Sequence, residues 1–439
     1  MTNILDDPAR DEALRRWIES LGYGTIADVK RVGGGAFRTS ARIEMKDRDD
    51  GKRPIFVKVD LGSAPPTPFD LQREYQVLKA IGGRVKAPDV LGYEPDLNAM
   101  AMPCLPGVAD YGQIEDEAKR ARVERSYVEA LLAVHRLELS SLSLDHLPAG
   151  LTIRQAIAAD LDLWRDLLLN GVTHPDAITL FALAWCAARL PDDDRPATLV
   201  QGDAGPGNFL FDEDGVTGVL DWEMAHVGHP LEDIGCILVR SLVQPMASAN
   251  DLLALYSQAS GVEWTRQELL YSAILMMTRF SVPISLALES RNTGLDFGLT
   301  NGYFRMSQIS LLRLIAQAEG IELSETIPDS AARPTADFEF EYLRSVLRDI
   351  VRPAVADDYV RYRLDGAVGL IGYLGGALAD SPEGAEGDAH SAFTEQERIV
   401  AGGGRKLAAA MQQMYGDALY REQLMREMLG PLHGRRIVI

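Results

Sequence analysis

The chain has 439 residues, of which 46% are hydrophobic and 25% charged, and its formal net charge is -20 at pH 7. This composition is typical of a soluble globular protein, and the length suggests two or three domains. The negative charge argues against a general binder of nucleic acid or of anionic membranes, because those partners are themselves polyanions.

The three cysteines and the N-terminal sequence indicate the compartment. Cys104, Cys186 and Cys236 lie in unrelated apolar contexts without the spacing of a metal site, which predicts reduced thiols. The N-terminus lacks the basic region and apolar run of a secretory signal, and no uncharged apolar run reaches the length of about 18 residues that predicts a membrane span. We therefore expect a cytoplasmic protein.

The first hundred residues alternate short strands with single helices. Apolar residues recur at helical spacing over residues 9–21, and the β-branched run PIFVKVD, residues 54–60, is typical of a strand. Residues 25–104 therefore predict a small sheet with one helix inserted after its third strand. The other elements expected here are strands on both sides of a glycine turn at 33–37, a helix over 70–81, and strands near 89–93 and 99–104.

The rest of the chain is mostly helical by its periodicity. Amphipathic helices are expected over residues 114–139, 153–169, 175–190, 231–259, 265–289 and 299–319. Strands at 198–200 and 209–211 flank a polar loop as a hairpin, and a strand at 216–220 follows. Beyond a polar linker at 324–337, helical stretches are expected over 338–376 and 393–428, separated by an acidic loop at 379–391.

A glycine-rich turn, GGGAF, joins the first two expected strands. Gly33, Gly34 and Gly35, followed by Ala36 and Phe37, let backbone N–H groups approach a ligand closely, and consecutive amides can cradle phosphate oxygens. The same turn is also common as a purely structural hairpin. It is not a Walker sequence, because no Gly-Lys-Ser/Thr follows it.

A lysine in the third expected strand raises the question of its partner. Lys58 lies within IFVKV, where its side chain either points to solvent or is buried with a counter-charge. Glu74, on the following helix, is the natural partner. A lysine–glutamate pair between the third strand and the next helix is the arrangement with which kinases hold the α- and β-phosphates of ATP.

Three polar residues follow short apolar runs in the middle of the chain. Asp203 and Asn208 have the spacing of the kinase catalytic loop, an Asp, four residues, then Asn. Asp221 ends the next apolar run, where kinases place a metal-binding Asp. Phosphoryl transfer to a hydroxyl needs a carboxylate that accepts the proton and oxygen ligands for Mg²⁺. Turn formation and capping are the alternative roles of these residues, but all three follow the glycine turn, the lysine and the glutamate in kinase order.

Two motifs carry a resemblance to a known family over residues 24–320. QGDAGPGN, residues 201–208, and LDWEMAHVGHPLEDIG, residues 220–235, resemble the aminoglycoside phosphotransferase (choline kinase-like) family of small-molecule kinases. That family usually has His-Gly-Asp at the first motif, so Gln201 is a departure. In kinases the histidine mainly braces the catalytic loop, and a glutamine can substitute for it by hydrogen bonding.

The resemblance implies an α+β, bilobal protein-kinase-like fold. It implies a nucleotide-binding N-lobe with a small antiparallel sheet over residues 1–104, a helical C-lobe with the catalytic and metal residues over 105–323, and an extra C-terminal helical domain over 338–439. ATP or GTP and Mg²⁺ are the implied cofactors, and a small molecule with a hydroxyl group is the implied acceptor. The C-terminal helices contain small residues, which makes them a candidate surface for a homo-oligomer.

The resemblance also implies roles for individual residues. Asp203 is the implied catalytic base, with Asn208 and Asp221 as the Mg²⁺ ligands. Lys58, braced by Glu74, is expected to contact the nucleotide phosphates, which the Gly33–Phe37 turn would cover. The segment 99–105 resembles the hinge that binds adenine through its backbone, around Met102 and Cys104. The structural residues expected around this site are His135, Trp222, Glu223 and Asp233.

The motifs and the C-terminal half of the kinase-like region also suggest an acceptor. The motif wording is similar to kinase domains allied with acyl-CoA metabolism, so a hydroxyacyl-CoA or a similar acid is the first hypothesis. The apolar helices over 265–289 and 299–319, with Arg279, Arg291 and Arg305, suit an acceptor with an apolar and an anionic part. The alternatives are an aminoglycoside or other amino-alcohol, and a nucleotide-binding pseudokinase module.

Overall fold

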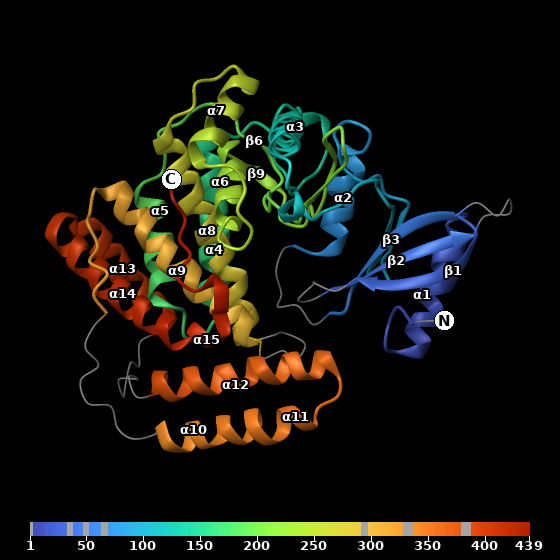
Figure 1. Ribbon diagram of the computed structural model, residues 1–439. Helices are drawn as coiled ribbons and strands as arrows, with labels where there is room; N and C mark the ends of the chain where they lie inside the picture. The colour runs from blue at the N-terminus through green and yellow to red at the C-terminus, as the bar shows by residue number, and fades with distance from the viewer. Residues whose placement is uncertain are drawn as a thin grey trace. The chain divides into compact units, whose positions relative to one another are not determined.

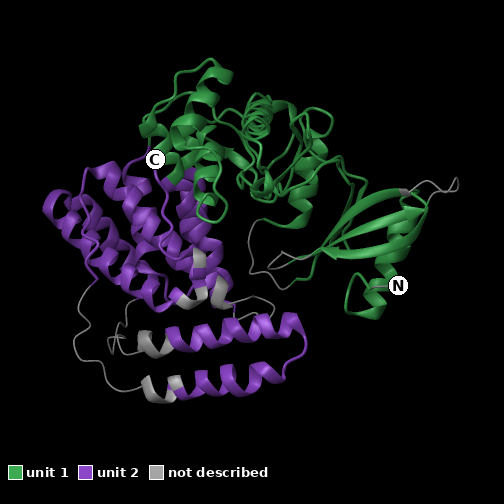
Figure 2. Ribbon diagram, in the orientation of Figure 1, with its two compact units in different colours: residues 1–157, 191–273, 439 green, residues 158–190, 274–438 purple. Residues whose placement is uncertain are grey.

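A computed structural model describes residues 3–32, 38–46, 52–62, 69–290, 297–327, 337–378 and 388–439. The glycine turn at 33–37 therefore lies outside the described residues, and so does Arg291. The chain forms two compact units (Figure 2). The first comprises residues 1–157, 191–273 and 439, and the second comprises residues 158–190 and 274–438.

The N-terminal part of the first unit is an antiparallel sheet of five strands, as the sequence predicts (Figure 1). The strands lie in the order β1-β2-β3-β5-β4, and each pairs with its neighbour in antiparallel register. Helix α2, Leu71–Ile81, follows the third strand. The strands are β1 (Thr25–Val32), β2 (Arg38–Lys46), β3 (Lys52–Asp60), β4 (Gly92–Glu94) and β5 (Ala99–Pro103).

Helix α1, Pro8–Ser20, closes one hydrophobic core of this sheet. Its first turn is capped by Asp7, whose carboxylate accepts from two backbone N–H groups, and a proline stands in the first turn, where its missing N–H costs nothing. Leu14 and Ile18 lie one turn apart on the buried face and join the same core as Ile43 and Val57 of the strands.

The remainder of the first unit carries two small antiparallel pairs of strands, and here the predicted pairing was wrong. Strand β6 pairs with β9, not with β7, and β7 pairs with β8. The polar loop between β6 and β7 is therefore not a hairpin turn, and the strand β9 was not predicted. The strands are β6 (Thr198–Val200), β7 (Phe209–Phe211), β8 (Val216–Val219) and β9 (His226–Gly228).

Helices precede and follow these strand pairs along the chain. The helix predicted over 231–259 is two helices, because the chain leaves the helical path after Arg240 and starts again with Ser248 as an N-cap. The helices and single turns are η1 (Tyr111–Gln113), α3 (Glu117–His135), η2 (Leu139–Ser141), α4 (Ile153–Gly171), α6 (Leu231–Arg240), α7 (Ala249–Ser260) and α8 (Arg266–Glu289).

Helix α8 is long and apolar enough, by length and composition only, to cross a membrane, and 83% of the apolar window is buried inside the protein. Core helices of soluble proteins have the same property. Both α4 and α8 begin in the first unit and end in the second.

The second unit is helical in its described parts. Helices α13 and α14 lie beside α5 and α9 respectively (Figure 1). The elements are α5 (Ala177–Ala188), α9 (Phe297–Glu319), α10 (Asp337–Ser345), the π-helical η3 (Val346–Val351), α11 (Arg352–Ala354), α12 (Asp358–Leu378), α13 (Ala389–Gly402), α14 (Gly404–Leu424), α15 (Arg426–Leu429) and η4 (Gly430–Leu432).

All three cysteines are free thiols, as predicted. Cys186 and Cys236 are buried, whereas Cys104 is half-buried at the end of β5. Burial raises the pKa of the Cys186 thiol to about 12, so this group stays protonated and behaves as a small apolar side chain.

Candidate active site

One buried carboxylate binds the start of the loop between β6 and β7, residues 201–208. Asp233, in the first turn of α6, accepts hydrogen bonds from the backbone N–H groups of Gln201 and Gly202, both at 2.9 Å. Its carboxylate also lies 3.0 Å from Nε2 of His135, whose Nδ1 lies 2.6 Å from the hydroxyl of Tyr256. The structural roles predicted for His135 and Asp233 are confirmed by these contacts.

Gly202 must be glycine for two separate reasons. Its φ of 87° is in the left-handed region, and a Cβ at this position would lie 2.2 Å from the carbonyl oxygen of Met224. We expect Gly202→Ala to lower the free energy of unfolding by more than the roughly 1–3 kcal/mol that backbone strain alone costs. Denaturant unfolding measures this. Gly150→Ala is the matched control, because Gly150 has a φ of 82° and open space around it. Equal losses in the two variants would show that the close contact is unimportant.

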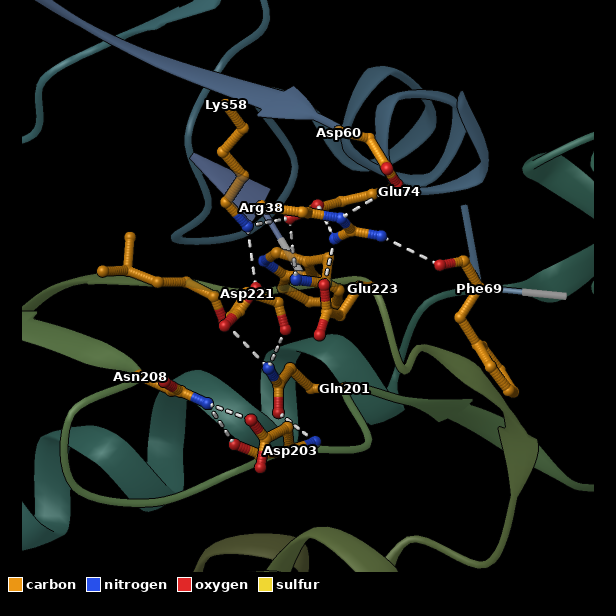
Figure 3. Close-up of polar contacts among 12 residues, drawn as sticks. Arg38, Lys58, Asp60, Phe69, Glu74, Gln201, Asp203, Asn208, Asp221 and Glu223 are labelled. Atoms are coloured by element: carbon orange, nitrogen blue, oxygen red, sulfur yellow. Dashed lines mark hydrogen bonds and ion pairs between the residues drawn. The ribbon is translucent and has the colours of Figure 1, made fainter. Parts of the chain in front are cut away.

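Gln201 braces the loop with its side chain, as the sequence predicts for a substitute of the usual histidine. It is fully buried, and its Nε2 donates to the carbonyl oxygens of Leu220 and Asp221 at 2.8 and 2.6 Å. Its Oε1 accepts from the N–H of Asp203 at 2.8 Å. The side chain thus ties the loop to the segment that carries the second aspartate (Figure 3).

Removal of this brace should lower the stability of the protein. We expect Gln201→Ala to lower the free energy of unfolding by roughly 1–3 kcal/mol, because it leaves buried backbone groups without partners. Gln155→Ala is the control, since Gln155 is an exposed glutamine that accepts one hydrogen bond from Thr152. Thermal unfolding of the two variants checks the expectation, and a Gln201→Ala protein as stable as the control would contradict it.

Asp203 lies in the middle of this loop, and both of its oxygens have a partner. Oδ2 accepts from Nδ2 of Asn208 at 2.6 Å, and Oδ1 lies 2.7 Å from Nη1 of Arg240. Partial removal from water, with the nearby charge of Asp221, raises the pKa of Asp203 to about 6, and Arg240 opposes this rise. The carboxylate is therefore ionised at neutral pH and able to accept a proton.

Asp221 is placed next to Asn208 by the β7–β8 pair. The N–H of Leu220 donates to the carbonyl oxygen of Asn208 at 2.8 Å, which extends the ladder by one step beyond the strands. Asp221 then has a φ of 59°, an uncommon value for a residue other than glycine. This turn directs the carboxylate toward Lys58 of β3, whose Nζ lies 2.7 Å from its Oδ1.

The predicted pair of Lys58 and Glu74 is confirmed. Lys58 Nζ lies 2.7 Å from Oε1 of Glu74, which is buried on α2. Although burial alone would lower it, the pKa of Lys58 is raised above its ordinary value by Asp221 and Glu74. For Asp221 the effect of burial is outweighed by Lys58, which lowers its pKa. Both groups therefore stay charged.

Two further charged residues belong to this cluster, and Arg38 was not predicted. Arg38, the first residue of β2, contacts the carboxylates of Asp60, Glu74 and Glu223 and donates to the carbonyl oxygen of Phe69 at 2.9 Å (Figure 3). Its place directly after a glycine turn gave no signal of burial.

Glu223, expected to be a supporting residue, contacts Arg38 and also faces two other carboxylates. Burial and Asp221 raise its pKa to about 7, against the opposing effect of Arg38. Oxygen atoms of Glu74, Asp221 and Glu223 lie within 4.8 Å of one another. Such a group of acidic oxygens is suited to a divalent cation.

The orientation of the predicted Mg²⁺ ligands fits a metal. Asn208 uses its Nδ2 for the bonds to Asp203, which leaves its carbonyl oxygen Oδ1 for a cation. Asp221 engages Lys58 through Oδ1, and its second oxygen has no hydrogen-bond or ion-pair partner among the described residues. Both are hard oxygen donors of the kind that Mg²⁺ prefers.

The predicted adenine-binding segment lies at the end of β5. Met102 is buried and opposes Phe56 of β3, while the N–H of Cys104 donates to the carbonyl oxygen of Pro54 at 3.1 Å. The N–H of Cys104 is therefore already used within the sheet, and a base would have to bind to other backbone groups of this segment.

The fold and the cluster define a class of protein, the kinase-like phosphotransferases. A Ralstonia eutropha JMP134 protein assigned as an aminoglycoside phosphotransferase superimposes with a TM-score of 0.54 at 16% identity, over 70% of this chain and 98% of its own. A macrolide 2'-phosphotransferase type I gives a TM-score of 0.50 at 18% identity, over 71% of this chain and 99% of its own. These structures show the shared fold.

The chain belongs to the phosphotransferase enzyme family, whose model matches residues 29–270, more than half of its length. It is therefore a small-molecule kinase. Among curated proteins it is similar to acyl-CoA dehydrogenase family member 11 of Gallus gallus, 29% identical over 42% of this chain, and of Homo sapiens, 33% identical over 27% of this chain. The matches cover only 25% and 15% of those two proteins.

Proposed function

We propose that this protein transfers the γ-phosphoryl group of ATP, bound with Mg²⁺, to a hydroxyl group of a small acceptor. The proposal rests on one observation above all: Lys58, Glu74 and Asp221 form a continuous ion-paired group, directly beside Asp203 and Asn208. These are the groups that phosphoryl transfer requires, in the order along the chain that kinases use.

In the proposed reaction Asp203 orients the acceptor hydroxyl and takes its proton. The hydroxyl oxygen forms a bond to the γ-phosphorus while the bond from that phosphorus to the β,γ-bridging oxygen breaks, and the diphosphate leaves. Lys58 holds the α- and β-phosphates in place. Most of the rate would come from positioning and from neutralisation of charge rather than from covalent chemistry.

Mg²⁺ would be held by Asn208 and Asp221 and would neutralise phosphate charge. The charge of the cluster supports a cation there. Asp60, Glu74, Asp221 and Glu223 surround the two cations Arg38 and Lys58, so carboxylates outnumber the basic groups. A divalent cation would remove this excess.

For the acceptor we propose a hydroxyacyl-CoA or a similar acid. The support is the sequence similarity to proteins named as acyl-CoA dehydrogenase family members. This similarity covers part of the chain. The arginines that first suggested an anionic acceptor do not support it. Arg279 is fully buried and its Nε lies 3.0 Å from Asp160, and Arg305 is paired with Asp176 at 3.0 Å.

The test is Mg²⁺-dependent consumption of ATP with a panel of acceptors. Hydroxyacyl-CoA thioesters of several chain lengths are compared with aminoglycosides and with simple amino-alcohols, and the phosphorylated product is identified by mass spectrometry. We expect transfer to a hydroxyacyl thioester. Transfer to an amino-alcohol alone would replace the acceptor but keep the reaction, whereas nucleotide binding without transfer to any hydroxyl would contradict the enzymatic proposal.

A further inference from the structure

The catalytic loop itself carries no basic residue: QGDAGPGN contains neither lysine nor arginine. In the site described above, Lys58 is engaged by Glu74 and Asp221. Positive charge next to Asp203 comes instead from Arg240, the last residue of α6. No sequence motif pointed to this residue.

The side chain of Arg240 lies against the loop and hydrogen-bonds to it. Its Nη2 and Nε donate to the carbonyl oxygen of Pro206 at 2.9 and 3.3 Å, and its Nη1 lies 2.7 Å from Oδ1 of Asp203. Gly205 has a φ of 146°, and a Cβ there would lie 2.7 Å from Cδ of Arg240. The glycine therefore leaves the space in which the arginine side chain crosses the loop.

Two N–H groups of the Arg240 guanidinium are not used by these contacts. An arginine side chain has five N–H groups, and the three contacts above use one on each nitrogen. The second N–H groups of Nη1 and Nη2 have no partner among the residues that the structure describes, and 30% of the side chain is exposed. A hydroxyl hydrogen-bonded to Oδ1 of Asp203 would lie no further than two hydrogen-bond lengths from Nη1, close enough for the guanidinium to reach a phosphoryl group in transfer to it.

We propose that Arg240 is a catalytic group of this site: it holds Asp203 and the Pro206 carbonyl while its two remaining N–H groups bind the phosphoryl group in transfer. This inference rests on the proposed phosphotransferase function. A guanidinium is suited to the role because its charge does not depend on pH and its planar donors match phosphoryl oxygens in pairs. Arginines that stabilise this transition state contribute about 10³- to 10⁵-fold to the rate in other phosphoryl transfers.

The experiment uses hydrolysis of Mg²⁺·ATP by water, so that no identified acceptor is needed. The full chain is compared with Arg240→Met, Arg240→Lys and Arg189→Met. Arg189 is the matched control, because its Nε lies 2.9 Å from Glu319 and its loss removes an ion pair of similar geometry. Arg189 and Glu319 both belong to the second unit, whereas Asp203 and Arg240 belong to the first. ATP affinity and thermal unfolding are measured for each.

We expect Arg240→Met to lower kcat by a factor of about 10³, with ATP affinity changed by less than a few-fold, and Arg240→Lys to recover part of the loss. Added guanidinium ion should partly restore the Met variant. If wild type hydrolyses ATP and Arg240→Met has the same kcat, this inference alone is overturned. Equal losses of kcat and ATP affinity in Arg240→Met, without recovery in Arg240→Lys, would also overturn it. A wild-type chain that neither binds nor hydrolyses Mg²⁺·ATP would overturn the proposed function and this inference with it.

Discussion

Replacement of Asp203 by asparagine should reduce phosphoryl transfer by about 10²- to 10⁴-fold, the range that a positioned general base contributes. Asparagine keeps the volume of the side chain and one oxygen for Asn208 or Arg240, but an amide cannot take the acceptor proton. Nucleotide affinity should remain within a few-fold of wild type, because no contact of Asp203 reaches Lys58 or Glu74 among the described residues. Steady-state turnover and ATP titration measure the two quantities separately.

Asp214→Asn is the control for this variant. Asp214 is an exposed aspartate in the turn between β7 and β8, on the same hairpin that carries Asn208 and Asp221. The substitution removes one charge from the same part of the protein without touching the loop. If Asp203→Asn and Asp214→Asn turned over ATP at similar rates, Asp203 would not be the catalytic base.

Local patterns predicted the N-terminal sheet and the order of the site residues. The β-branched run around Lys58 and the amphipathic helix around Glu74 are strong signals, because each depends on residues close together in the chain. Once the strand and the helix pack against each other, the ion pair is expected, because a buried lysine needs an opposite charge. These parts of the fold and of the site could therefore be predicted.

Long-range pairing and the supporting charges could not be predicted. Strand β9 has three residues, fully buried, so it shows no alternation, and its partner β6 lies far along the chain. Arg38 and Arg240 are unremarkable in sequence. A basic residue in the last turn of a helix is favoured by the helix dipole alone, so Arg240 gave no sign of a contact with Asp203.

The missed strand pairing and the missed charged residues have one physical origin. The site residues lie in short local motifs, whereas many of their contacts join segments far apart in the chain. Gln201 shows this division: its position beside Asp203 follows from the motif, but its bonds to Leu220 and Asp221 depend on how the second segment folds back. The effect of glutamine in place of the usual histidine could therefore be assessed only once these hydrogen-bond partners were known.

Asp221→Asn should abolish the response of the enzyme to Mg²⁺ and reduce turnover by at least about 10²-fold, since metal-ion neutralisation of a transferring phosphoryl group contributes several kcal/mol. Asparagine is chosen because it tolerates the left-handed φ of 59° better than alanine does, so the turn is kept while the charge is lost. Lys58 retains Glu74 as a partner in this variant and stays charged. The test is a titration of turnover with Mg²⁺. The turnover of wild type should saturate, whereas the turnover of Asp221→Asn should remain low at every Mg²⁺ concentration. If the variant saturated at the same Mg²⁺ concentrations as wild type, Asp221 would not be a ligand. The same titration of Asp214→Asn, which leaves the cluster intact, should follow wild type.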